Sequence, residues 1–146
     1  MPSSTICVDA NLVVRMLERN AEGQRILAIW RQWDAEGRTL VAPALIYFEI
    51  TNALYRYVRK GQMTATEVTE ALDVALNLHI DVHRGDDLHY HAMRIAGALG
   101  LPACYDAHYL ALAERLGAEL WTADQRLYNS VRRSLPWVHA VEEHHD

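Results

Sequence analysis

The sequence has few of the residues that build disulfide-rich, membrane-spanning or loosely structured proteins. Among its 146 residues are two cysteines, seven glycines and four prolines. Cys7 and Cys104 have no CxxC or Cys/His spacing, so we predict neither a disulfide framework nor a zinc finger and interpret both as small buried thiols. The longest apolar run, residues 40–48, is far too short to cross a bilayer. The start, MPSSTICVDANLVV, lacks the basic segment of a secretory signal. These absences predict a cytoplasmic protein without a membrane segment.

Basic residues are also in the minority, 14 against 19 acidic ones, which gives a formal net charge of -5. That charge argues against binding nucleic acid through a broad basic surface. It is compatible with a phosphodiesterase that works through divalent ions, because such an enzyme needs a cluster of acids. Apolar side chains, by contrast, are plentiful at 51% of the residues, enough for the core of a single domain spanning residues 1–146.

Short β-branched segments alternate with amphipathic ones along the chain. Strands are predicted at residues 5–9, 39–42, 79–83, 118–122 and 137–141. Helices are predicted at residues 10–19, 21–37, 43–61, 64–78, 86–100, 102–117 and 123–133. Pro43 suits the first turn of its helix, and Thr64 with Glu67 matches a capping box. The alternation predicts an α/β fold with a mostly parallel sheet covered on both faces, whose ligands bind beyond the carboxyl ends of the strands.

Four acidic residues stand alone among apolar neighbours: Asp9, Glu49, Asp106 and Asp124. An isolated ionised carboxylate costs on the order of tens of kcal/mol in an apolar medium, so it protonates, pairs with a cation or binds a metal. Basic residues are scarce in these segments, and the predicted topology can bring the four acids to one edge of the sheet. A set of oxygen ligands selects Mg²⁺ or Mn²⁺, ions that activate water for phosphodiester hydrolysis.

Helix capping offers a simpler explanation for three of these acids. Thr122 begins a T-x-x-Q capping box, which would make Asp124 a first-turn residue favoured by the helix dipole. Asp9 and Asp106 could each be an N-cap. Glu49 has no capping explanation. Taken singly, each aspartate could therefore be either a cap or a ligand.

Three segments, VDANLVV, FEITNAL and YDAHYLALAERLGAELWTADQRL, together resemble the PIN-domain nucleases. The likeness is strongest to the VapC type of toxin ribonuclease from bacterial type II toxin–antitoxin pairs, and it extends from residue 6 to about residue 141. It implies a three-layer α/β/α sandwich with a five-stranded parallel sheet. It also implies an endoribonuclease in which four acids hold the ion that activates a water against RNA. The residues that match the family's metal ligands are Asp9, Glu49, Asp106 and Asp124. Thr122 matches its hydroxyl residue, which orients a ligand or a water, and Asn11 and Asn52 fall in supporting positions.

The same resemblance implies the cofactor and the partners. They are Mg²⁺ or Mn²⁺, an RNA substrate, a second copy of the chain in a homodimer, and a cognate antitoxin that lays a segment across the acidic groove. Some relatives carry a further acid soon after the fourth one. The corresponding segment here supplies none, which leaves a second metal ion open: Gln125, Arg126, Tyr128 and Asn129.

Two other functions share parts of this pattern. An aspartyl-phosphate phosphotransfer or phosphatase module also carries acids at strand ends. A dehalogenase-like phosphatase would have a second aspartate where this chain has Asn11, and a receiver would have a late lysine, whereas the only lysine is Lys60. The third possibility, a non-catalytic RNA-binding module on the same fold, would be expected to have lost one of the four acids.

The histidines and the basic clusters are interpreted as structural or solvated. His79 and His83 fall on a predicted strand, where their spacing does not converge on one ion, and His89 and His91 face different sides of a helix. The pair near the end of the chain, His144 and His145, is interpreted as solvated. The basic clusters, interpreted as solvated surface that could also contact an RNA backbone, are Arg56, Arg59 and Lys60, and Arg132 and Arg133.

Overall fold

The computed structural model describes residues 4–141 and is built around a five-stranded sheet in which every pairing is parallel. The strands are β1 (Thr5–Val8), β2 (Thr39–Pro43), β3 (Ile80–His83), β4 (Glu119–Thr122) and β5 (Val138–Ala140). Their order is β3-β2-β1-β4-β5. The strand order therefore changes direction between β1 and β4, the kind of position at which open α/β sheets bind ligands.

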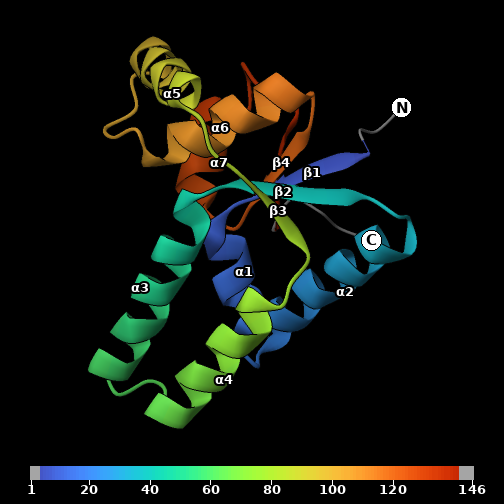
Figure 1. The fold of residues 1–146 in the computed structure, drawn as a ribbon, viewed down its shortest axis with the longest axis vertical. Helices are drawn as coiled ribbons and strands as arrows, with labels where there is room; N and C mark the ends of the chain where they lie inside the picture. The colour runs from blue at the N-terminus through green and yellow to red at the C-terminus, as the bar shows by residue number, and fades with distance from the viewer. Residues whose placement is uncertain (1–3, 142–146) are drawn as a thin grey trace.

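Helices cover both faces of the sheet (Figure 1). They are α1 (Ala10–Leu17), α2 (Ala21–Ala35), α3 (Leu45–Arg59), α4 (Ala65–Leu76), α5 (Asp86–Leu99), α6 (Tyr105–Leu116) and α7 (Gln125–Val131). Figure 1 shows α1 to α4 on one side and α5 and α6 on the other. Right-handed crossovers explain this division, because the chain moves one way across the sheet from β1 to β3 and the other way from β3 to β5. The predicted three-layer α/β/α sandwich is confirmed.

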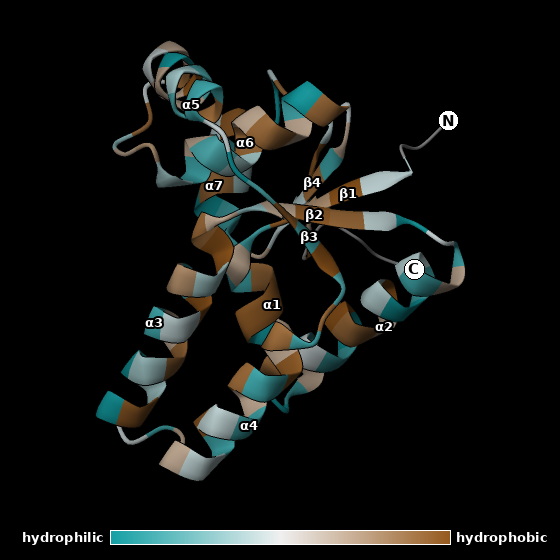
Figure 2. Ribbon diagram, viewed as in Figure 1, coloured by the Kyte–Doolittle hydropathy of each residue, from teal (hydrophilic) through white to brown (hydrophobic). Residues whose placement is uncertain are grey.

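The core lies against the central strands, which consist largely of hydrophobic residues (Figure 2). Ile6 and Val8 of β1 and Leu120 of β4 are completely buried, as expected for a parallel sheet covered on both sides. Helix α6 packs against β1, β2 and β4, and its consecutive residues 109–113 are all completely buried. A helix enclosed in this way has little freedom to move, so the side chains that it carries are held in fixed positions.

The predicted strands and helices are all present, with small shifts at their ends. The predicted capping box is confirmed: Glu67 N donates to Thr64 Oγ1, and Thr64 N donates to Glu67 Oε1. The placement of Pro43 in a helix is wrong, because pairing with β3 continues to His83 and makes Pro43 the last residue of β2.

The two cysteines differ from each other in the structure. Cys7 is buried in β1 as predicted, but the prediction of a buried Cys104 is wrong, since this residue lies exposed just before α6. Across residues 4–141 there is no helix with both the length and the apolar character needed to cross a membrane.

Candidate active site

Four carboxylates from different parts of the chain gather at the carboxyl edge of the central strands. Asp9 directly follows β1, and Asp124 lies two residues beyond β4. Glu49 lies in the second turn of α3, and Asp106 is the second residue of α6. Burial first, and then the neighbouring carboxylates of the group, raise the pKa values of three of them: Asp9, Glu49 and Asp106. The structure thus brings together the four predicted acids, which we name the acid cluster.

Asp9 is the most deeply buried member of the acid cluster, with 3% of its surface exposed. Its Oδ2 accepts hydrogen bonds from Thr122 Oγ1 at 2.9 Å and from Asn11 Nδ2 at 3.2 Å. Burial, followed by the charge of Asp106, raises its pKa to about 7, although the Thr122 hydroxyl acts in the opposite direction. Asp9 occupies the N-cap position of α1, but its side chain makes no capping hydrogen bond. Capping therefore does not explain why this residue is an acid.

Glu49 is half-buried, and a tyrosine hydroxyl holds its carboxylate. Tyr109 of α6 donates a hydrogen bond of 2.6 Å to Glu49 Oε1. Burial raises the pKa of Glu49, and the Tyr109 bond partly offsets that increase. Tyr109 is absent from the predicted site residues. Its one signal in the sequence is a hydroxyl within the otherwise apolar stretch YLALA, three residues after Asp106.

Asp106 and Asp124 differ in how far capping explains them. Cys104, and not Asp106, is the N-cap of α6, so the capping alternative for Asp106 is wrong. Burial and then the charge of Asp124 raise the pKa of Asp106. Asp124 is the N-cap of α7, and its Oδ1 accepts hydrogen bonds from the backbone N–H groups of Arg126 at 3.0 Å and Leu127 at 3.1 Å. These bonds use only one of its two carboxylate oxygens.

Thr122 and Asn11 connect the ends of the two central strands. The T-x-x-Q capping box predicted to begin at Thr122 is wrong, because Thr122 is the last residue of β4 and its hydroxyl donates to Asp9 while accepting from Asp124 N at 2.9 Å. Asn11 Oδ1 accepts from Ala123 N at 2.9 Å. Asn11 therefore holds the loop after β4 against the start of α1. Asn52 lies on the exposed surface of α3 and is not part of this network.

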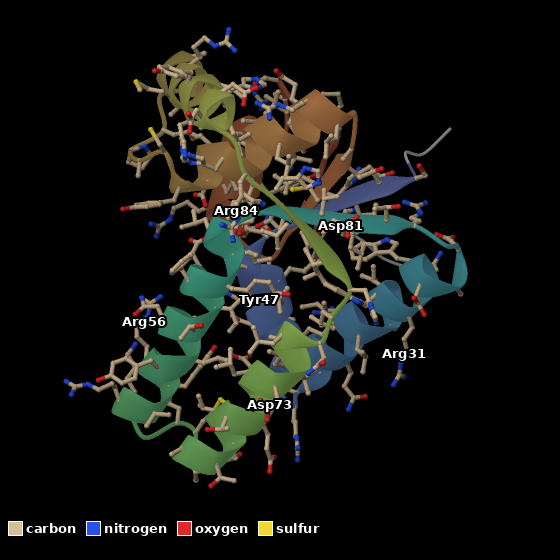
Figure 3. All side chains as sticks on the ribbon, in the orientation of Figure 1. Arg31, Tyr47, Arg56, Asp73, Asp81 and Arg84 are labelled. Carbon is tan, nitrogen blue, oxygen red and sulfur yellow. The ribbon has the colours of Figure 1, made fainter. Side chains whose placement is uncertain are left out.

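Basic side chains do not neutralise the acid cluster. None of the ion pairs formed within residues 4–141 includes one of its carboxylates. Arg56, the basic residue two turns after Glu49, projects from the outer side of α3 (Figure 3). Apart from the electrostatic effect of His108 on Glu49, these coupled carboxylates have no cationic partner among the described residues, and such a set of oxygen ligands has the chemistry expected of a Mg²⁺ or Mn²⁺ site.

The carboxylates are not yet arranged as a complete coordination shell. In the described part of the chain, no group of three or more Asp, Glu, His or Cys side chains is placed to hold a metal ion. Like charges repel one another, so separated carboxylates are the expected arrangement of the acid cluster by itself.

Two histidines of α5, His89 and His91, contact different side chains. His89 Nδ1 is 2.8 Å from His108 Nε2, and His91 Nε2 is 2.9 Å from Glu114 Oε1. Both partners belong to α6, so these contacts do not confirm the prediction that His89 and His91 face different sides of their helix. The predictions for His144 and His145 fall outside the described residues. The basic clusters are exposed as predicted: Arg56, Arg59, Lys60, Arg132 and Arg133.

Comparisons with known proteins agree with this fold. The PIN domain family model matches residues 6–132. Ribonuclease VapC3 of Mycobacterium tuberculosis is 32% identical over 141 residues, covering 96% of this chain and 94% of the relative. The crystal structure of PAE2754 from Pyrobaculum aerophilum superposes with a TM-score of 0.70 at 25% identity, covering 94% of this chain and 91% of that one. A toxin–antitoxin complex from Klebsiella pneumoniae has the same fold, with a TM-score of 0.64 at 16% identity and coverage of 93% and 97%.

Proposed function

The chain belongs to the PIN domain family, and we propose that the acid cluster is the centre at which it cuts RNA. Its relatives are VapC ribonucleases, and the chain is accordingly a toxin endoribonuclease of a toxin–antitoxin pair. The proposed ligands of Mg²⁺ or Mn²⁺ are Asp9, Glu49, Asp106 and Asp124, with Thr122 as a supporting hydroxyl.

The observation that carries this proposal is the environment of Asp9. Its carboxylate is almost completely buried and surrounded by three further acids, and no ion pair in residues 4–141 offsets the charge. A structural carboxylate would ordinarily be paired, because an unpaired buried charge is strongly destabilising. Keeping four carboxylates close together costs stability unless a bound cation offsets their mutual repulsion.

A bound divalent ion supplies this site with a water of lowered pKa and with positive charge for the phosphate under attack. Hydrogen bonds within the chain fix the orientation of two of the proposed ligands, Asp9 and Asp124. Thr122 and Asn11 bind one oxygen of Asp9 and leave Oδ1 available. The backbone N–H groups at the start of α7 bind one oxygen of Asp124 and leave Oδ2 available. Each of these two acids can therefore offer an oxygen without giving up its structural hydrogen bonds.

The charge of the site also determines when RNA can bind. The chain has a formal net charge of -5, and the acid cluster concentrates negative charge at the carboxyl edge of the sheet. A phosphodiester approaching these carboxylates is repelled unless cations neutralise them. We therefore expect RNA to bind productively only when Mg²⁺ or Mn²⁺ is present.

The proposed partners follow from the family. They are a second copy of this chain and an antitoxin that covers the acid cluster, and the Klebsiella pneumoniae neighbour is itself a toxin–antitoxin complex. We propose that all of them act in the cytoplasm, where the RNA substrate lies. The phosphotransfer alternative receives no support, since Lys60, the only lysine of the sequence, is the C-cap of α3 at the end of the helix away from Glu49.

The test is an RNA cleavage assay that compares the wild type with Asp9→Asn. We expect the wild type to cut RNA with Mn²⁺ or Mg²⁺ and to stop when EDTA is added, and the variant to be inactive under both conditions. Asp73→Asn is the matched control, because Asp73 is an exposed acid on α4, away from the acid cluster (Figure 3). Cleavage that persists in Asp9→Asn or in EDTA would refute the mechanism, and labelling by a small phosphodonor would favour phosphotransfer.

A further inference from the structure

A buried tyrosine connects two elements of the acid cluster that are far apart in the sequence. Tyr109 of α6 donates its hydroxyl to Glu49 Oε1 of α3 at 2.6 Å, across 60 positions of the chain. Tyr109 is completely buried, whereas Glu49 is only half-buried. The acid cluster thus receives a hydrogen bond from a side chain that has no access to solvent.

Glu49 needs such a partner more than Asp9 and Asp124 do. Asp9 is held by two side chains, and Asp124 is held by two backbone N–H groups. Glu49 is longer and has more rotatable bonds, so leaving it free would carry a larger entropy cost when it is ordered around an ion. Among the described residues, the hydrogen bond from Tyr109 is the only one that its carboxylate accepts.

Tyr109 is itself fixed by the core. Its ring lies within the buried segment 109–113 of α6, and its backbone carbonyl accepts a hydrogen bond from the Cys7 thiol of β1 at 3.7 Å. The hydroxyl therefore cannot follow Glu49 if that side chain swings toward solvent. It selects the conformers of Glu49 that keep Oε1 against α6 and leave Oε2 free.

We propose that Tyr109 is a positioning residue that orients Glu49 for divalent metal binding. This inference rests on the proposed function, since it presumes that Glu49 is a metal ligand. Tyr109 contacts a ligand residue and not the RNA, so it acts through the affinity for the ion. Outer-shell partners of this kind typically change metal affinity by roughly 10–100-fold when they are removed.

The experiment measures Mn²⁺ binding to the RNA-free protein by calorimetry, in the wild type and in Tyr109→Phe, which keeps the buried ring and removes only the hydroxyl. We expect the Kd for Mn²⁺ to rise roughly 10–100-fold. Tyr47→Phe is the matched control, because the Tyr47 hydroxyl donates to the Ala75 carbonyl at 3.2 Å, between α3 and α4 (Figure 3). It should bind Mn²⁺ like the wild type. Circular dichroism of each metal-free variant verifies that it is folded.

Two variants of Glu49 separate this inference from the proposed function. Glu49→Gln removes the ligand charge, and Glu49→Asp keeps the charge but shortens the reach to Tyr109; both should weaken Mn²⁺ binding. If Glu49→Gln binds like the wild type, the proposed function fails. If Glu49→Gln is impaired while Tyr109→Phe and Glu49→Asp bind normally, only the role of Tyr109 fails. Equal losses of Mn²⁺ affinity in Tyr109→Phe and Tyr47→Phe would also overturn the proposed role of Tyr109.

A second readout distinguishes positioning from general damage. In RNA cleavage, Tyr109→Phe should require more Mn²⁺ for half-maximal rate, yet approach the wild-type kcat, within about threefold, once the ion saturates. A kcat that stays low at saturating Mn²⁺ would contradict a role exerted through metal affinity.

Discussion

The buried Asp9 carboxylate makes a quantitative prediction about the stability of the metal-free protein. Folding moves this group from water to a buried position beside three other acids, and its pKa rises from 3.8 to about 7. The substitution Asp9→Asn removes the charge and keeps the shape. The carbonyl oxygen of the new amide can accept the bonds that Thr122 and Asn11 now donate to Oδ2, and its N–H groups can donate to the remaining acids. We therefore expect the variant to fold and to be more stable than the wild type near neutral pH.

The size of the effect follows from the pKa shift. Each pKa unit corresponds to about 1.4 kcal/mol, so a rise of about three units amounts to roughly 4 kcal/mol. Below the unfolded pKa, Asp9 is protonated in both states and the penalty is absent. The penalty grows as the pH increases, since the unfolded chain loses the proton first, and it is complete once the pH exceeds the folded value of about 7.

The assay is urea denaturation in EDTA at a series of pH values. The difference in unfolding free energy between Asp9→Asn and the wild type should be small near pH 4 and approach roughly 4 kcal/mol near pH 8. Asp73→Asn, an exposed substitution, should stay within about 0.5 kcal/mol of the wild type throughout. A variant that is less stable than the wild type at pH 8, or a difference that does not change with pH, would refute the reasoning.

Three further substitutions, the last with Gly97→Ala as its control, test other parts of the structure. Asp106→Asn should abolish RNA cleavage while the metal-free melting temperature stays equal or rises, since repulsion within the acid cluster decreases; a lower melting temperature would count against this. Thr122→Val removes the hydroxyl that donates to Asp9, so urea denaturation should show a loss of roughly 1–3 kcal/mol together with slower cleavage, and unchanged stability would contradict it. Gly23→Ala should lower the melting temperature, because its Cβ would meet backbone carbonyl oxygens at the end of α1. Gly97→Ala, whose Cβ meets nothing within 4 Å, should not, and similar effects of the two changes would argue against the close approach of α2 to the end of α1.

Much of the fold could be predicted because its signals are local. The β-branched run before Asp9 and the apolar stretch before Thr122 predict buried strands wherever they occur, and Thr64 with Glu67 makes its capping box with neighbours in the sequence. The ends of elements are less predictable. Pro43 belongs to β2 because of pairing with β3, a distant segment whose register no local pattern reveals.

The acid cluster was predictable in its membership, but its supporting contacts were predictable only in part. A carboxylate among apolar neighbours is conspicuous in any sequence, since burying an unpaired charge is costly. Only the family resemblance pointed to a supporting role for Asn11, and nothing pointed to one for Tyr109, because an amide or a hydroxyl on a helix is common. Their roles depend on what lies opposite them, at separations of 112 and 60 residues.

The sequence by itself thus determined the alternation of strands and helices, the excess of acids and the four carboxylates in apolar surroundings. Only the tertiary structure decided that β1 and β4 lie side by side and that Asp124 is both a helix cap and a member of the acid cluster. It also decided that a buried hydroxyl holds Glu49, while Cys104 faces solvent. The physical reason is that hydrophobic patterning and capping act over a few residues, whereas hydrogen bonds and electrostatic coupling between distant segments exist only after those segments have packed together.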